Sequence, residues 1–205
     1  RLVNAGDMFV AIVGYKTDGH VYVESALQSG ATVIAVAAGH YDISMIPEHI
    51  TVIVAEDTRK LLALSACNYY GHPSREFRLV GVTGTKGKTT TTYMIKAMLE
   101  AAGHKTGLIG TIETIIGDVV TPANNTTPES IVLQKTLKDM VDAGLDSVVM
   151  EVSSQGLMLD RVAGVEFDYG IFTNLSQDHI GPNEHKDFDD YKYWKSQMFT
   201  MCKVG

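Results

Sequence analysis

The 205-residue chain is long enough for one large domain or two small ones, each able to bury an apolar core. Its hydrophobic fraction of 45% and charged fraction of 20% are ordinary for a water-soluble globular protein. The net charge of −7 argues against a general nucleic-acid surface, so any anionic ligand must be held by local groups.

Membrane and disulfide signals are weak in this sequence. No apolar run reaches the length of a bilayer span, and the N-terminal residues lack the apolar segment of a signal peptide. The two cysteines, Cys67 and Cys202, lie far apart and have no CxxC spacing. We therefore expect two reduced thiols and a cytoplasmic location.

The first 74 residues predict a small α/β domain. Strand-like and helical patterns alternate in the order 9–13 (strand), 21–29 (helix), 31–37 (strand), 51–55 (strand) and 57–70 (helix), with Asp57 as the N-cap of the last. The connector Gly71–Ser74 combines Gly and Pro directly before a new strand. This composition indicates a domain boundary between residues 74 and 75.

Residues 75–205 predict a second α/β domain with a mostly parallel sheet. The expected elements are 77–82 (strand), 89–102 (helix), 106–110 (strand), 111–120 (hairpin around Gly117-Asp118), 128–143 (helix), 147–152 (strand), 168–173 (strand) and 188–201 (helix). Thr127 is the expected cap of the helix that starts at Pro128. In such a fold, ligands gather at the carboxyl ends of the strands.

A Gly-rich turn, Gly84-Thr-Lys-Gly-Lys-Thr89, stands between the first strand and helix of this domain. Such a turn aims backbone N–H groups and the positive end of the helix dipole at one spot. Lys88 adds a charge for a terminal phosphate, and the Thr89 hydroxyl can ligate Mg²⁺. Val82 stands where the strict Walker A spacing has Gly. The alternative is a turn without a ligand, but the context favours a nucleoside-triphosphate site.

Polar residues end two later strands at the same edge as this turn. Glu151 ends one, and Asn174 ends another, with Asp178-His179 four residues further on. A carboxylate beside a phosphate loop is a natural Mg²⁺ ligand, although Glu151 could also serve as a helix cap or an ion-pair partner. For His179 the pattern leaves a ligand and a structural loop histidine equally open.

Two further groups have both a binding and a structural interpretation. The cluster Asn124–Pro128 suits phosphate or sugar binding, but ordinary capping explains Thr127 better. Arg161 could hold a carboxylate or phosphate with its guanidinium, or could form a surface ion pair with Asp160 or Glu166.

The last helix contains an apolar stripe formed by Tyr191, Trp194 and Met198, which is more typical of a core than of a cofactor site. Lys195 borders this stripe. By pattern alone it is a solvated lysine with no sign of a catalytic role.

Taken together, several motifs resemble the Mur ligase family, and most of all its dipeptide-extending members. The motifs are Gly6-Asp-Met-Phe-Val-Ala11, Gly14, Asp18-Gly-His20, Gly81–Thr90, Asn125-Thr-Thr-Pro-Glu129, Glu151-Val-Ser-Ser154, Phe172-Thr-Asn-Leu-Ser-Gln-Asp-His179 and Tyr191-x-x-x-Lys195. The resemblance covers nearly the whole chain. It implies an N-terminal UDP-substrate domain without its first strand, followed by the first part of a central ATPase domain. A C-terminal domain would be absent, and we expect this fragment to be inactive alone.

The resemblance also implies roles for individual residues. The family's ATP loop matches Gly84, Thr85, Lys86, Gly87, Lys88, Thr89 and Thr90. Its magnesium and catalytic groups match Lys88, Thr89, Glu151, His179 and Lys195, the last as a carbamylated lysine. Its substrate contacts match Tyr15, Lys16, Thr17, Asn125, Thr126, Thr127, Ser153 and Arg161. Three positions depart from the family pattern: Lys86 replaces a usual Asn, Gln155 replaces a common His, and Leu159 stands where a polar contact can occur.

The activity that the resemblance implies is an ATP- and Mg²⁺-dependent ligation. A diamino acid, meso-diaminopimelate or L-lysine, would be joined to UDP-N-acetylmuramoyl-L-alanyl-D-glutamate through an acyl phosphate, in peptidoglycan precursor synthesis. We expect a monomer that binds neither nucleic acid nor membrane. The alternatives are another amide ligase of the superfamily, such as a folylpolyglutamate or cyanophycin synthetase, and a nucleotide-binding module without turnover.

Overall fold

A computed structural model describes residues 3–15 and 17–203 of the chain. It divides into two compact units, Arg1–Leu62 and Ala63–Gly205. The division falls within helix α2 (Thr58–Tyr69). The domain boundary between residues 74 and 75 stays a prediction.

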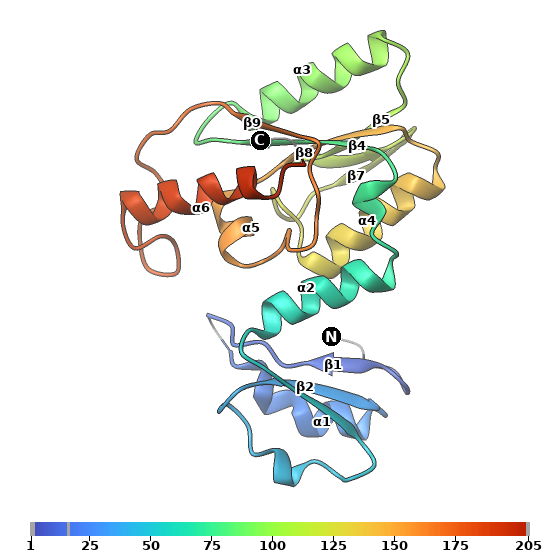
Figure 1. Ribbon diagram of the computed structural model, residues 1–205, viewed down its shortest axis with the longest axis vertical. Coiled ribbons are helices and arrows are strands. Elements are labelled where there is room, and N and C mark those ends of the chain that lie inside the picture. Colours follow the sequence, from blue (N-terminus) through green and yellow to red (C-terminus); the bar gives the residue numbers. More distant parts are fainter. Residues whose placement is uncertain (1–2, 16, 204–205) are drawn as a thin grey trace. The chain divides into compact units, whose positions relative to one another are not determined.

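The first unit is a three-stranded parallel sheet in the order β1 (Met8–Val10), β2 (Val33–Ala37) and β3 (Thr51–Ala55). Its helical segments are η1 (Gly19–Tyr22), α1 (Val23–Gln28), η2 (Ile43–Met45) and the start of α2. Val23 and Ala26 of α1 pack against Ile34 and Val36 of β2, so this small sheet buries one apolar face under a helix (Figure 1). The Asp57 carboxylate accepts the N–H groups of two residues in the first turn of α2, which confirms it as a cap.

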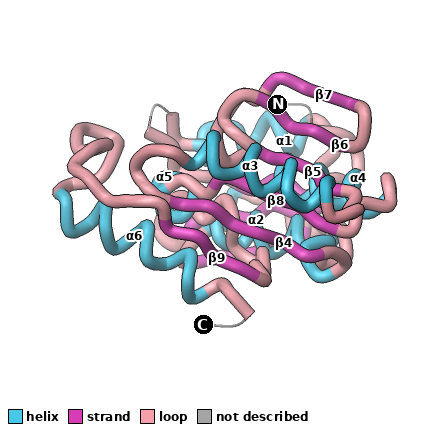
Figure 2. The backbone as a smooth tube through the Cα atoms, turned by 90° about the horizontal axis from the view of Figure 1, so that it is seen from above, coloured by secondary structure: helices cyan, strands magenta, loops and turns pink. Residues whose placement is uncertain are grey.

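The second unit contains a six-stranded sheet in the order β7-β6-β5-β8-β4-β9, shown strand by strand in Figure 2. The strands are β4 (Arg78–Thr83), β5 (Thr106–Ile109), β6 (Glu113–Ile116), β7 (Val119–Pro122), β8 (Ser147–Glu151) and β9 (Tyr169–Phe172). Strands β5, β8, β4 and β9 run parallel, and the β6–β7 hairpin adds two antiparallel strands at the β5 edge. Both the parallel sheet and the hairpin were expected.

Helices cover both faces of this sheet. They are α3 (Lys88–Ala101) on one face and α4 (Ser130–Asp142), α5 (Ser154–Met158) and α6 (Phe188–Thr200) on the other (Figure 1). Side chains alternate along each strand, so Leu79 and Met150 join the core under α4 and α6, whereas Val80 and Val149 face α3. Burial on both faces explains why the centre of β8, Val148–Met150, consists of consecutive apolar residues. No helix in the described part of the chain is long and apolar enough to cross a membrane.

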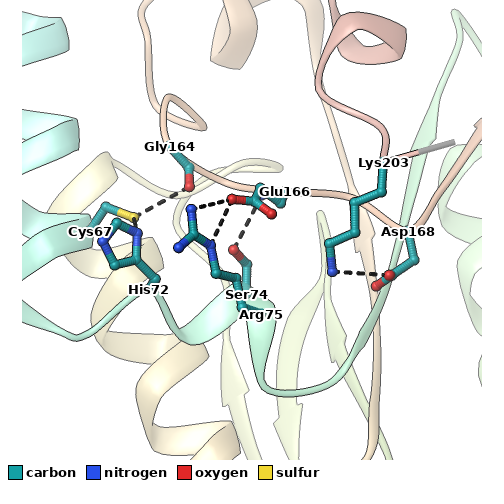
Figure 3. Close-up of polar contacts among 8 residues, drawn as sticks. All are labelled: Cys67, His72, Ser74, Arg75, Gly164, Glu166, Asp168 and Lys203. Carbon is teal, nitrogen blue, oxygen red and sulfur yellow. Dashed lines mark hydrogen bonds and ion pairs between the residues drawn. The ribbon is translucent and has the colours of Figure 1, made fainter. Parts of the chain in front are cut away.

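The segment after α2, with the short helix η3 (Pro73–Arg75), is fastened to the loop before β9 within the second unit (Figure 3). The Cys67 thiol donates to the Gly164 carbonyl at 3.3 Å and lies 3.2 Å from His72 Nδ1. Arg75 pairs with Glu166. Burial raises the pKa of the Cys67 thiol, so it stays protonated and acts as a hydrogen-bond donor. Both cysteines are free thiols.

The predicted start of α4 is wrong. The helix begins at Ser130 and its N-cap is Glu129, so Pro128 lies before the first turn and Thr127 is not the cap. The Thr127 hydroxyl is buried and has other partners: it donates to the Glu151 carbonyl and accepts the Ser153 N–H. A tertiary contact to the end of β8 has replaced the local capping bond that the sequence pattern favoured.

Candidate functional site

The turn between β4 and α3 requires glycine at two positions. Gly84 has φ 138°, and a Cβ built on it would lie 2.0 Å from the Thr173 Oγ1 atom. Gly87 is the N-cap of α3 with φ 83° in the left-handed region. The first turn of α3 therefore presents its unpaired N–H groups at the carboxyl end of β4.

Asn174, just beyond β9, holds this turn in place. Its backbone carbonyl accepts the Thr85 N–H at 2.9 Å, and its side-chain oxygen accepts the Lys86 N–H at 3.0 Å. Its amide also donates to the Lys86 carbonyl at 2.9 Å. These N–H groups are therefore occupied inside the protein, and an anionic ligand would have to use the N–H groups nearer α3.

Two lysines from distant helices converge on one carbonyl oxygen. Lys88 Nζ donates to the Gly84 carbonyl at 3.0 Å, and Lys195 Nζ donates to the same oxygen at 2.7 Å. Burial lowers the pKa of Lys88. Burial, followed by repulsion from Lys88, lowers the pKa of Lys195 to about 7.

The prediction of a solvated Lys195 is wrong, because only 2% of this residue is exposed. Its Nζ atom lies 4.5 Å from the centre of the Tyr191 ring, one helical turn earlier. The Tyr191 hydroxyl donates to Thr85 Oγ1 at 3.1 Å, which fastens α6 to the Gly-rich turn. The helix therefore turns the side that bears Tyr191 and Lys195 toward the phosphate loop.

Glu151, at the end of β8, is 1% exposed and accepts three hydrogen bonds. They come from the Thr89 hydroxyl at 3.0 Å, the Thr111 hydroxyl at 3.0 Å and the Thr111 N–H at 2.9 Å. A hydroxyl and a carboxylate in contact form an oxygen donor set that fits Mg²⁺. We call Gly84, Lys88, Thr89, Glu151 and Lys195 the P-loop cluster.

A cleft of about 310 Å³ opens beside this cluster. Its walls come from Lys88, Thr111, Asn124, Asn125, Thr126, Ser153, Ser154, Gln155, Arg161, His179, Glu184 and His185. Parallel strands β4, β5 and β8 bring the loops that carry most of these residues to one edge of the sheet. Lys88 thus shares one cleft with the Asn125–Thr126 segment, Ser153 and Arg161.

The far wall of this cleft is built around Arg161. One Nη atom donates to the Thr127 carbonyl at 3.1 Å, and the other pairs with Glu129 at 2.7 Å. Neither partner was expected; the sequence had suggested Asp160 or Glu166, and Glu166 pairs with Arg75 instead. The set Asn125, Thr126, Thr127, Glu129, Ser153 and Arg161 is called the Arg161 cluster below.

His179 lies on the cleft wall in a left-handed backbone conformation, with φ 54°. Its Nδ1 atom is 3.4 Å from the Glu184 carboxylate, and its ring lies 6.0 Å from that of Tyr191. Its side chain is half exposed. A half-exposed imidazole that lines the same cleft as Lys88 can coordinate a metal or donate a hydrogen bond to a phosphate oxygen. The structure therefore brings it to the cleft without joining it to Glu151.

The expected uridine contacts lie in the first unit. Tyr15 and Thr17 are exposed on a tight turn in which the Gly14 N–H donates to the Thr17 carbonyl at 3.1 Å. Lys16 lies outside the described residues. How this turn contributes to binding stays a prediction.

One possible metal cluster was not foreseen. Within the described chain, Asp18, His20 and His40 are the group whose ligand atoms lie within 4.8 Å of one another. His20 Nε2, however, accepts the Ala37 N–H at 2.9 Å, while Nδ1 contacts Asp18. Metal on Nδ1 would require a proton on Nε2, opposite that N–H group. The cluster is better explained as a set of hydrogen bonds that connects the turn at Asp18 to strand β2.

Sequence reasoning missed several residues that the cleft brings together. Thr111 is the second residue after β5, so the rule that polar residues end strands near ligands could have found it. Glu184 and His185 lie in the long loop between β9 and α6, where no periodicity or spacing marks them. Glu129 belongs to a quoted motif, but its contact with Arg161 depends on tertiary structure.

Family models match both parts of the chain. Residues 82–205 match the Mur ligase middle domain, and residues 1–70 match the Mur ligase family, catalytic domain. The chain belongs to the Mur ligase family. The predicted resemblance and α/β fold class are thereby confirmed.

Named relatives are similar along almost all of the chain. UDP-N-acetylmuramoyl-L-alanyl-D-glutamate–2,6-diaminopimelate ligase of Clostridium tetani is 52% identical over 199 residues, 97% of this chain and 40% of the relative. The enzyme of that name from Bacillus licheniformis is 44% identical over 201 residues, 98% of this chain and 40% of the relative. The chain therefore spans about two fifths of these relatives.

Solved structures agree with the fold. A structure of a UDP-N-acetylmuramoyl-L-alanyl-D-glutamate–2,6-diaminopimelate ligase aligns with a TM-score of 0.79 and 25% identity, covering 97% of this chain and 39% of that one. The MurF ligase of Thermotoga maritima in complex with ADP aligns with a TM-score of 0.60 and 22% identity, covering 98% and 42%. The second likeness supports the architecture alone.

Proposed function

We propose that this chain is part of an ATP-dependent ligase that joins a diamino acid to UDP-N-acetylmuramoyl-L-alanyl-D-glutamate in peptidoglycan precursor synthesis. The names of its relatives support the acceptor and favour 2,6-diaminopimelate as the added amino acid. One observation carries the proposal: Lys88 of the phosphate loop and Arg161 line the same cleft. A phosphate donor and a carboxylate acceptor can therefore meet there.

The proposed reaction joins a carboxylate of the acceptor to the amine of the diamino acid in two steps. One of the two carboxylates of the D-glutamyl residue attacks the γ-phosphorus of ATP, and ADP leaves. The amine of the diamino acid then attacks the acyl carbon of the resulting acyl phosphate. It loses a proton, and the products are an amide and inorganic phosphate. Catalysis of such a transfer is mainly positioning and charge stabilisation.

The P-loop cluster would bind and orient ATP. Segment 84–90 would hold the phosphates with its α3 N–H groups, and Lys88 would leave the Gly84 carbonyl to contact the transferred phosphoryl group. Thr89, Glu151, His179 and Lys195 would hold Mg²⁺. When bound, the ion would offset the negative charge of the phosphoryl oxygens.

Lys195 would contribute to metal binding as a carbamate. An uncharged lysine amine adds to CO₂ and releases a proton, and the product is an anion on the same side chain. Burial, which favours the neutral amine, supports this assignment.

The Arg161 cluster would position the acceptor. Asn125 and Thr126, which carry an amide and a hydroxyl, line the cleft, and the guanidinium of Arg161 matches a carboxylate. Thr127 and Ser153 would complete this wall. Tyr15, Lys16 and Thr17 would contact the UDP part. We further infer a cytoplasmic monomer with no nucleic-acid or membrane partner.

A phosphate-release assay on the full-length gene product tests the proposal. ATP and UDP-N-acetylmuramoyl-L-alanyl-D-glutamate are supplied with meso-diaminopimelate or L-lysine in turn. We expect phosphate release only when ATP, acceptor and meso-diaminopimelate are all present. A folded protein that binds ATP but releases no phosphate with either amino acid would favour another ligase of the family or a nucleotide-binding module.

A further inference from the structure

Arg161 is held in the cleft wall by partners that belong to the protein itself. Only 11% of its side chain is exposed, and Glu129 pairs with one Nη atom at 2.7 Å. The Thr127 carbonyl accepts from the other at 3.1 Å. A guanidinium that is assigned to a ligand thus already has an anion beside it.

This arrangement leaves the guanidinium incompletely satisfied. The Nε atom of Arg161 is buried and has no hydrogen-bond partner among the described residues. An unpaired buried donor costs free energy. A ligand carboxylate offers two oxygens in one plane, which can meet Nε and an Nη on one edge of the guanidinium. The single contact between one Glu129 oxygen and Nη2 provides less.

The Glu129 carboxylate does not cap helix α4, so capping does not explain its position. Its backbone forms the N-cap of α4, but its side chain accepts no N–H from the first turn. By contrast, the N-caps of α5 and α6, Ser153 and Asp187, both accept such bonds with their side chains. The Glu129 carboxylate, 41% exposed, is turned toward Arg161.

We propose that Glu129 is a stand-in anion for Arg161. It neutralises the guanidinium while the cleft is empty, and a carboxylate of the acceptor displaces it on binding. This inference rests on the proposed function, which assigns Arg161 to the acceptor. Glu129 excludes anions that would make only one contact with Arg161. A carboxylate that pairs with the guanidinium through both of its oxygens displaces Glu129.

A double-mutant cycle on the full-length protein tests this exchange. Binding of UDP-N-acetylmuramoyl-L-alanyl-D-glutamate without ATP is measured by calorimetry for wild type, Glu129→Gln, Arg161→Ala and the double variant. Because the substitution removes a competing anion, we expect Glu129→Gln to bind the acceptor about three- to tenfold more tightly than wild type. In the Arg161→Ala background the same substitution should change nothing.

Other outcomes overturn the inference. Weaker or unchanged binding by Glu129→Gln would show that Glu129 supports Arg161 or is indifferent to it. Equal tightening in both backgrounds would show a general charge effect. Wild-type affinity in Arg161→Ala alone would remove Arg161 from acceptor binding, and with it that part of the proposed function. If Glu129→Gln does not fold, Glu129→Asp keeps the charge near α4 with a shorter reach, and it should also tighten binding.

Discussion

The P-loop cluster and the Arg161 cluster border one cleft but are built differently. In the first, Glu151 and Lys195 are 1% and 2% exposed, and both lysines bond to a backbone carbonyl. In the second, the Glu129 side chain is 41% exposed and pairs with another side chain. Glu151 and Lys195 are therefore held in place before a ligand arrives and only Lys88 would change its partner, whereas Arg161 in the second set would exchange one anion for another. Phosphoryl transfer benefits from fixed dipoles. In the proposed exchange, Glu129 lowers the affinity for the acceptor but keeps single-contact anions off Arg161.

The largest expected effect comes from a substitution in the P-loop cluster. Lys88→Ala in the full-length enzyme removes the charge that would meet the transferred phosphoryl group, so kcat/KM should fall at least about 10²-fold. Acceptor binding, measured without ATP, should stay within about threefold of wild type because the Arg161 cluster is untouched. Lys138→Ala, which breaks an exposed pair with Asp142 on α4, is the control and should have no effect. Equal losses of ligation and acceptor binding would contradict the division into two clusters.

Lys195 should give a loss of similar size that can be repaired chemically. If its carbamate is a ligand of the metal, Lys195→Ala should lower activity about 10²-fold, and millimolar formate or acetate should restore part of it. Lys88→Ala should not respond to these acids, since they cannot replace a cation. An absence of rescue at every concentration would count against the carbamate.

The sequence predicted the P-loop cluster better than the Arg161 cluster, for a physical reason. Segment 84–90 combines its glycines, lysines and hydroxyls in one strand-to-helix turn, so a local pattern was enough to predict these residues as a candidate site. The pairing of Lys195 with Gly84 spans 111 positions, and no local pattern contains it. The same holds for Glu129 and Arg161, whose contact depends on how α4 and the loop after α5 pack.

Adding one methyl group should disrupt the backbone geometry of the P-loop cluster. Gly84→Ala would place a Cβ 2.0 Å from Thr173 Oγ1 at φ 138°, so we expect a loss of unfolding free energy of about 3 kcal/mol or more. Gly144→Ala is the matched control: its φ is also positive, at 69°, but no atom lies within 4 Å of the new Cβ. It should cost only about 1 kcal/mol. Urea unfolding measures both, and equal costs would show that the contact with Thr173 is unimportant.

The buried Lys195 amine predicts a pH dependence of stability. Its pKa is lowered from 10.5 to about 7, so between these values the unfolded chain binds a proton that the native protein lacks. The free energy of unfolding should then rise with pH across this window, by at most about 1.4 kcal/mol per pH unit. In CO₂-free buffer, Lys195→Met should be more stable than wild type at pH 7. This difference in unfolding free energy should therefore shrink from pH 7 to 9.5. Parallel stability curves for the two proteins would contradict the lowered pKa.

The smallest effects separate two adjacent threonines of the Arg161 cluster. Thr127 is fully buried, and its hydroxyl bridges the Glu151 carbonyl and the Ser153 N–H. Thr127→Val leaves both groups unpaired, so stability should fall by about 2 kcal/mol. Thr126 is partly exposed and bonds to the Thr111 hydroxyl, so Thr126→Val should cost about 0.5 kcal/mol or less.

Acceptor binding should rank these two variants in the opposite order. The Thr127 hydroxyl already has two protein partners and has little left for a ligand, whereas Thr126 lines the cleft and its hydroxyl bonds only to that of Thr111 among the described residues. We therefore expect Thr126→Val to weaken acceptor binding about fivefold and Thr127→Val to weaken it less, once both are measured as folded proteins. If Thr127→Val proves the weaker binder at equal folded concentration, the bridge behind Glu151 controls the acceptor wall, and the two clusters are coupled.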